Sequence, residues 1–226
     1  MSSLFNSTPA PVSSAGWGRT VATHKVLRNT YALLSMTLLF SAAVAALGVA
    51  LKLPSPGIIL TLVGYFGLLF LINKVQNSGW AIPAVFALTG FMGYTLGPVL
   101  SAQLALPGGG QTIALALGAT GVTFFSLSAW VLATRKDFSF MGGFLFAGMV
   151  VAIVAGLAGV FLQIPALSLA VSAMVALLSA GLILFETSRI VNGGETNYVM
   201  ATVSLFVSLF NLFTSLLSLF GYGNND

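Results

Sequence analysis

The sequence has no cysteine, one histidine and four acidic residues among 226. Without cysteine there is no disulfide, thiolate metal site or cysteine nucleophile. The histidine, His24, precedes the first long apolar segment, while Asp137 and Asp226 fall in a loop and at the chain end, so neither a histidine site nor a paired-aspartate protease site is expected within the apolar part. The HExxH and P-loop patterns are also missing. We therefore expect no enzyme, no cofactor and no metal site.

Charge is scarce throughout the chain. Only 5% of the residues are charged and 58% are hydrophobic, whereas soluble domains carry about 25% charged residues. The mean hydropathy is +1.03, which indicates a protein whose surroundings are the lipid bilayer. The basic residues are scattered and form no patch, so a nucleic-acid partner is not expected.

Seven apolar segments approach or exceed the length of about 20 residues that a helix needs to cross a bilayer. The stretches "KLPSP" and "ALPGGGQ" interrupt the apolar sequence, because proline and glycine disfavour helix continuation. The predicted spans are Tyr31–Leu51, Gly57–Asn73, Trp80–Leu100, Thr112–Thr134, Phe140–Leu162, Pro165–Glu186 and Val199–Phe220. The fold class is therefore an all-α membrane protein with seven transmembrane helices.

The distribution of basic residues predicts how these spans are oriented. Cytoplasmic loops of membrane proteins carry an excess of lysine and arginine. One set of alternate loops holds Arg19, Lys25, Arg28, Lys74, Arg135, Lys136 and Arg189, and the other set holds only Lys52. We therefore expect a flexible cytoplasmic tail (1–29), rich in Ser, Ala, Thr and Pro, a transmembrane domain (30–221) and a short periplasmic end (222–226).

The stretch "LFETSRIVNGGETNY" holds two of the four acidic residues, Glu186 and Glu195, with Arg189 between them. A carboxylate at the bilayer centre costs about 2.5–3.5 kcal/mol on insertion scales. Arg189 follows Glu186 by three residues and shares its helix face if the helix continues, and Lys74 is a second candidate partner. Two interpretations stay open, namely an ion pair that anchors the helix at the membrane edge and a titratable group that gates a cavity.

Polar side chains recur along the last span at the spacing of one helix face. They are Asn197, Ser204, Ser208, Asn211, Ser215 and Ser218. These side chains predict either hydrogen bonds between helices or a hydrated path. The pair Gly93 and Gly97 is a GxxxG pattern, which indicates close helix packing in a compact bundle.

Four stretches together resemble the Bax inhibitor family of seven-span membrane proteins: "THKVLRNTY", "LPSPGIILTLVG", "LFETSRIVNGGETNY" and "ATVSLFVSLFNLF". The resemblance extends from Thr23 to Gly221 and is greatest to a bacterial branch that modulates the membrane-anchored FtsH protease. It implies that the last helix is central in the bundle. It also implies an inner-membrane modulator that binds and restrains FtsH and contacts the associated HflK/HflC complex. The sequence predicts no oligomeric state.

The resemblance also implies an alternative function, a pH-sensitive leak of calcium or another ion. Family members linked to this leak carry two facing aspartates in the last two spans. Glu186 matches the first position and Ser208 the second, where the family pattern "SLYLD" appears as "SLFVS". One carboxyl facing a hydroxyl cannot share a proton as two carboxyls can, and calcium prefers several oxygen ligands. The departure at Ser208 therefore argues against the leak and leaves the modulator role intact.

Overall fold

The structure is a computed structural model that describes the backbone of residues 14–223 and the side chains of residues 23–223. Its helices are α1 (Ser14–Ala50), α2 (Gly57–Val75), α3 (Ala81–Leu104), α4 (Gly109–Thr134), the short 3₁₀ helix η1 (Ser139–Met141), α5 (Gly142–Leu162), α6 (Pro165–Val191) and α7 (Tyr198–Gly223). The seven α-helices are all long and apolar enough to cross a membrane. The predicted fold class is confirmed.

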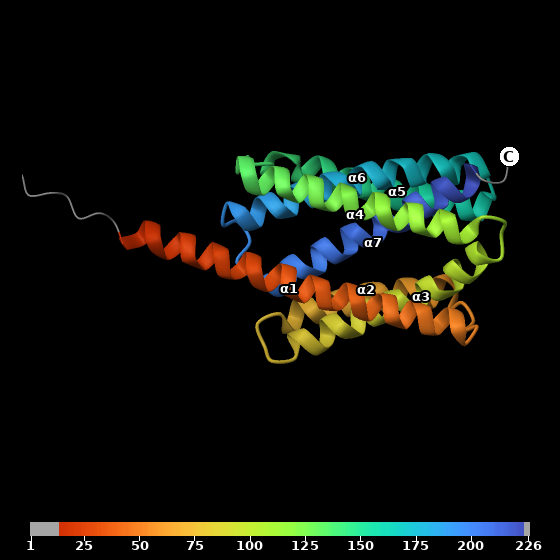
Figure 1. Ribbon diagram of the computed structural model, residues 1–226, viewed down its shortest axis with the longest axis horizontal. Helices are drawn as coiled ribbons and strands as arrows, with labels where there is room; N and C mark the ends of the chain where they lie inside the picture. Colours follow the sequence, from red (N-terminus) through yellow and green to blue (C-terminus); the bar gives the residue numbers. More distant parts are fainter. Residues whose placement is uncertain (1–13, 224–226) are drawn as a thin grey trace, which may run out of the picture.

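The last helix is central in the bundle. Figure 1 shows α7 crossing obliquely between one group formed by α1, α2 and α3 and another formed by α4, α5 and α6. It packs against α1, α3, α4 and α6. Half of its most apolar window is buried, compared with 6% for α2, which lies at the periphery. The central position implied by the family resemblance is therefore confirmed.

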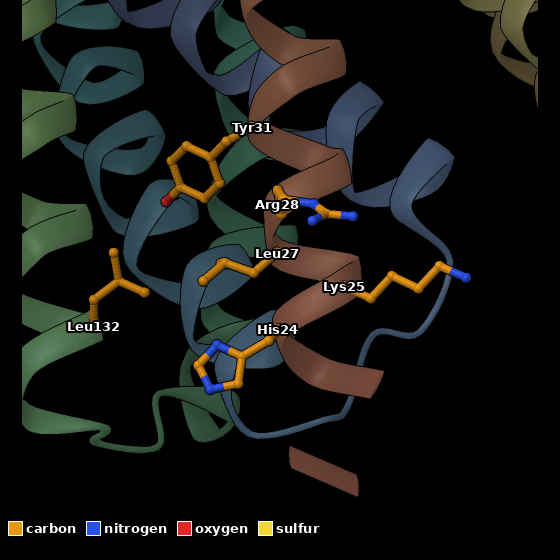
Figure 2. Close-up of a pocket in the computed structure, with 6 residues that line it drawn as sticks. All are labelled: His24, Lys25, Leu27, Arg28, Tyr31 and Leu132. Carbon is orange, nitrogen blue, oxygen red and sulfur yellow. The ribbon is translucent and has the colours of Figure 1, made fainter. Parts of the chain in front are cut away.

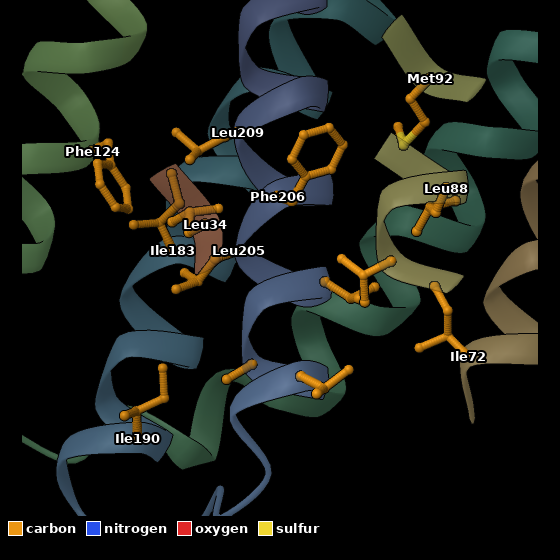
Figure 3. Close-up of a cluster of buried hydrophobic side chains, with 14 of the residues drawn as sticks. Leu34, Ile72, Leu88, Met92, Phe124, Ile183, Ile190, Leu205, Phe206 and Leu209 are labelled. Atoms are coloured by element: carbon orange, nitrogen blue, oxygen red, sulfur yellow. The ribbon is translucent and has the colours of Figure 1, made fainter. Parts of the chain in front are cut away.

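The buried core surrounds α7 on both sides (Figure 3). Phe206 of α7 is 1% exposed and belongs to one cluster with Leu34 of α1, Leu88 of α3 and Ile183 of α6. Large apolar side chains elsewhere point outward, such as Phe146. This distribution fits a bundle whose outer surface meets lipid rather than water.

Helix α1 and helix α3 approach each other closely at the predicted GxxxG pair. A Cβ atom added to Gly93 would overlap the carbonyl oxygen of Ser41, and one added to Gly97 would lie 3.2 Å from the Cα of Gly48. Only glycine permits backbones to come this near, and such packing associates helices in lipid. The C-terminal part of α1 is therefore fixed against the second half of α3.

The first helix begins earlier than expected. Residues 14–29, which we expected to be part of a flexible tail, are helical and continue into the span. Val26 and Leu27 pack against the core, and Thr30 is fully buried, so tertiary contacts hold this polar segment in the helix. The helix continues toward its N-terminus past the candidate span, which starts at Thr23. The expectation of flexibility for residues 1–13 lies outside the described residues.

The last turn of α6 was also underestimated. The helix ends at Val191, beyond the expected end at Glu186, and this extra turn places Arg189 on the same continuous helix as Glu186. Other boundaries follow proline and glycine as expected. Helix α2 begins directly after Pro56, and α6 begins at Pro165, where the missing amide hydrogen costs no hydrogen bond.

Candidate functional site at the charged end of the bundle

Most of the charged side chains gather at one end of the molecule. The successive helices alternate in direction, so the start of α1 and the α2–α3, α4–η1 and α6–α7 connections share one end (Figure 1). The charged residues with described side chains at this end are Lys25, Arg28, Lys74, Arg135, Lys136, Asp137, Glu186, Arg189 and Glu195, whereas Lys52 follows α1 at the other end. We call the end of the bundle that carries this group of charged residues the charged end.

The α6–α7 turn folds back on the end of α6 through two glycines. Gly193 has φ +75°, a conformation that favours glycine. The amide of Gly194 donates to the carbonyl of Arg189 at 2.8 Å, and the amide of Gly193 donates to that of Ile190 at 3.3 Å. This pair of bonds is the Schellman arrangement, which closes a helix C-terminus. It returns the chain so that Glu195 faces the side chain of Arg189.

Arg189 bridges both glutamates of this stretch. Its Nη1 lies 3.4 Å from Oε2 of Glu186, and its Nη2 lies 3.1 Å from Oε2 of Glu195. The side chains of Glu186 and Glu195 are 8% and 15% exposed, and that of Arg189 is 32% exposed. The guanidinium carbon also lies 5.5 Å from the ring centre of Phe185. One cation therefore serves two largely buried carboxylates.

The structure thus gives Arg189 a partner that the sequence did not reveal. Spacing along a helix shows the pair with Glu186, but Glu195 meets Arg189 only because the turn reverses the chain. Lys74, the second partner considered for Glu186, is exposed at the end of α2 and forms no ion pair with the described side chains. We call Glu186, Arg189 and Glu195 the ionic triad.

Asn197 joins the start of α7 to the α2–α3 connection. Its Oδ1 accepts a hydrogen bond from the amide of Val199 at 2.9 Å, which caps the helix. Its Nδ2 donates to Oδ1 of Asn77 at 3.1 Å and to the carbonyl of Gln76 at 3.3 Å. The other oxygen of Glu195 accepts from the amide of Asn197 at 2.8 Å. Asn197 therefore caps the start of α7 and also connects the α6–α7 turn to the α2–α3 connection.

Ser188 joins α6 to the α4–η1 connection, a contact that the sequence did not predict. This fully buried hydroxyl accepts from the amide of Phe138 at 2.9 Å and donates to the carbonyl of Lys136 at 3.1 Å. Nearby, the amide of Ser139 donates to Asp137 at 2.8 Å, and hydrogen bonding from Ser139 lowers the pKa of the Asp137 carboxyl. Together Asn197 and Ser188 fix the three loops of the charged end to one another.

The polar residues of α7 are only partly interior. Ser208 and Ser215 are buried, Ser204 and Asn211 are half-buried, and Ser218 is exposed. The hydroxyl of Ser208 donates to the carbonyl of Ser204 at 2.8 Å, which is a bond within its own helix. Across residues 23–223 no hydrogen bond joins Ser208 to Glu186, whose carboxylate receives one from Arg189.

The ionic triad stabilises charge at this end of the bundle. Within the described part of the chain, no group of three histidine or acidic side chains gathers as a metal site would require. The ionic triad has its carboxylates engaged by a cation and a backbone amide. These contacts therefore hold the α6–α7 turn against the end of α6 and place a largely buried carboxylate at the charged end of the bundle.

Known proteins resemble this chain over most of its length. The family described as "Inhibitor of apoptosis-promoting Bax1" matches residues 23–225. A protein of Escherichia coli K12 named "Modulator of FtsH protease YccA" is 58% identical over 206 residues, which cover 91% of this chain and 94% of that protein. An "Uncharacterized membrane protein" of Vibrio cholerae is 46% identical over 220 residues, which cover 97% of this chain and 99% of that relative.

Proposed function

The chain belongs to the Bax inhibitor family of membrane proteins, and from this premise we propose that it binds the membrane-anchored FtsH protease and restrains it. The observation that carries the proposal is the identity of 58% with a named modulator of that protease across 91% of the chain. The family model also matches residues 23–225, which include all seven candidate membrane spans. The contact surface for the protease is therefore sought on this bundle.

We place the protein in the bacterial inner membrane with its charged end in the cytoplasm. A second strain of Escherichia coli has a relative, also 58% identical, named "Inner membrane protein YccA". The bias of seven basic residues against one supports a cytoplasmic N-terminus and a periplasmic C-terminus. In this orientation the three joined loops and the early part of α1 face the cytoplasm (Figure 1).

We attribute the restraint to two features of the chain. One is an N-terminal segment that the protease can grip, which we call the handle, and the other is a helix bundle that resists extraction. A protease that pulls its substrate needs an end to grip, and the N-terminal segment before Thr23 precedes the candidate span. Pulling on α1 would have to separate it from α3 at Gly93 and from α7, where the hydroxyl of Thr202 donates to the carbonyl of Thr30 at 3.3 Å. A bound substrate that resists extraction occupies the protease and slows its other work.

Affinity purification from detergent-solubilised membranes tests the binding. We expect the tagged chain to retain FtsH, and to retain HflK and HflC only when FtsH is present in the cell. A chain without residues 1–13 should still bind FtsH but should be degraded more slowly, because the bundle remains while the handle is shortened. The proposal fails if FtsH does not co-purify. If the shortened chain is degraded as fast as the parent, the protease does not grip the chain through this N-terminal segment.

A pH-sensitive ion leak is the second candidate, and the buried carboxylate of Glu186 favours it. Ser179 and Thr187 on the same helix are also buried with hydroxyls that find no partner among the described residues, as a hydrated interior would require. Against the leak, Arg189 neutralises Glu186, and Ser208 supplies no second carboxyl. Calcium flux through liposomes that contain the purified chain would establish the leak, and the absence of flux leaves the modulator.

A further inference from the structure

A basic cleft of about 720 Å³ opens beside α1 at the charged end. Its described lining includes His24, Lys25 and Arg28, and none of these three forms an ion pair with the described side chains. Figure 2 shows Tyr31, Leu27 and His24 on the side of α1 that faces Leu132 of α4, whereas the side chains of Arg28 and Lys25, which also line the cleft, extend toward the other side of α1. No acidic residue is part of this lining, so the cleft is suited to an anion.

A separate apolar groove of about 560 Å³ lies further along the same two helices, with the central helix α7 and part of α3 at its base. Small side chains such as Ala42 and Ala46 open it on α1, and Gly121 opens it on α4. Two of its hydroxyls are already satisfied, since Ser35 donates to the carbonyl of Tyr31 at 2.8 Å and Thr120 to that of Ala116 at 2.7 Å. The groove therefore offers hydrocarbon contacts and no free polar group from these two residues.

Tyr31 lies between the cleft and the groove. It lines the cleft, and its ring centre lies 5.8 Å from that of Phe124, which lines the groove. Its hydroxyl is buried and has no hydrogen-bond partner among the described residues. A buried hydroxyl without a partner costs free energy, so an acceptor supplied by a ligand at this junction would be stabilised.

We propose that the cleft and groove between α1 and α4 together form a binding site for an anionic glycerophospholipid. The phosphate would lie near Arg28, His24 and Lys25, an ester or phosphate oxygen would accept from Tyr31, and one acyl chain would occupy the groove. Basic pockets between transmembrane helices bind anionic headgroups in this manner. This site adds to the proposed restraint of the protease and does not depend on it.

The two-part shape distinguishes a lipid from other occupants. A free anion would use the basic cleft and leave the apolar groove without a ligand. An apolar helix from another protein would fill the groove but would leave three basic side chains and the Tyr31 hydroxyl without an anionic or accepting group. A phospholipid supplies both parts in the order that the structure requires, with charge at the end of the bundle and hydrocarbon along its side.

Native mass spectrometry of the delipidated protein in detergent tests the headgroup contact. We expect dioleoyl phosphatidylglycerol to bind more tightly than dioleoyl phosphatidylcholine, which has the same acyl chains. Arg28→Gln and Lys25→Gln should each weaken binding of the anionic lipid about fivefold. Lys74→Gln is the matched control, because Lys74 is an exposed lysine at the same end that lines neither cavity, and it should leave binding unchanged.

A second pair of variants tests the groove. An added Cβ meets no atom within 4 Å at either Gly121 or Gly118, so both helical positions accept a larger residue. Gly121→Leu would fill the groove and should weaken phosphatidylglycerol binding, whereas Gly118→Leu projects onto a separate surface of α4 and should not. Glycerol 3-phosphate, which has the headgroup chemistry without acyl chains, should bind far more weakly than the lipid.

Four results would overturn the proposal. Equal binding of the two lipids by the parent would remove the role of the basic cleft, and equal effects of Arg28→Gln and Lys74→Gln would do the same. Equal effects of the two leucine variants would remove the groove. Glycerol 3-phosphate binding as tightly as the lipid would assign the cleft to a free anion. The unfolding temperature of each variant is compared with that of the parent, so that weaker lipid binding can be distinguished from unfolding of the protein.

Discussion

Replacing Arg189 by glutamine should destabilise the bundle more than any change to its two glutamate partners. Glutamine keeps an amide donor but loses the positive charge. The change would leave two carboxylates, 8% and 15% exposed, without the cation that they share. Removal of one partner from a buried ion pair costs about 3–5 kcal/mol. Because the Arg189 side chain is 32% exposed, we expect the lower end, about 3 kcal/mol.

The glutamate variants provide the comparison. Glu186→Gln keeps an oxygen that accepts from Arg189, and Arg189 keeps its closer partner Glu195, so we expect a loss of about 1 kcal/mol. Replacing both glutamates by glutamine in the Arg189→Gln background should restore most of the stability, because no unpaired buried charge remains. The variants thus separate the free energy lost with the Arg189 contacts from the free energy cost of leaving a buried carboxylate unpaired.

The assay is reversible unfolding in mixed micelles of mild detergent and dodecyl sulfate, followed by circular dichroism and by a fluorescent label at an added cysteine. The native chain has no cysteine, so one introduced site gives a unique label. We expect the folding equilibrium constant of Arg189→Gln to fall about 100-fold. The hypothesis that Arg189 serves both carboxylates is wrong if Glu186→Gln lowers the free energy of unfolding as much as Arg189→Gln does. It is also wrong if the combined variant is no more stable than Arg189→Gln alone.

Three further predictions concern packing, the family acid pair and orientation. Gly93→Ala should lower the free energy of unfolding by about 2 kcal/mol, because the new Cβ overlaps a backbone carbonyl of α1, whereas Gly67→Ala, with no atom within 4 Å, should not. Ser208→Asp adds a second carboxyl, which can share a proton with Glu186 if the two lie close, and should give pH-dependent calcium leak in liposomes; leak equal to that of the parent at acidic and neutral pH would contradict this. A reporter fused after Gly223 should be active only as a periplasmic reporter, and cytoplasmic activity would reverse the orientation.

The sequence predicted the fold because apolar length and proline are local signals. Each of the seven spans was recognisable from its own composition, and Pro56 and Pro165 mark helix starts that the structure confirms. The start of α1 was missed because His24, Lys25 and Arg28 make the segment look polar. Val26 and Leu27 nevertheless pack against the core, and nothing local to the sequence shows that contact.

The charged end was only partly predictable for the same reason. Arg189 and Glu186 are three residues apart, so helix periodicity reveals the pair. The contact between Asn197 and Asn77 spans 120 residues, and no spacing rule links two positions so distant. The polar face of α7 was overestimated because that helix crosses the bundle obliquely (Figure 1), so Ser208 is buried while Ser218, on the same face, is exposed.

The most direct test of the central claim is the rate at which purified FtsH degrades a membrane substrate in proteoliposomes with ATP. We predict that adding this chain slows degradation in proportion to its amount, while an unrelated seven-helix protein of similar size does not. The same preparation without ATP should still show the chain bound to FtsH. A degradation rate that stays unchanged at a large molar excess of the chain would contradict the proposed function as a modulator of the protease.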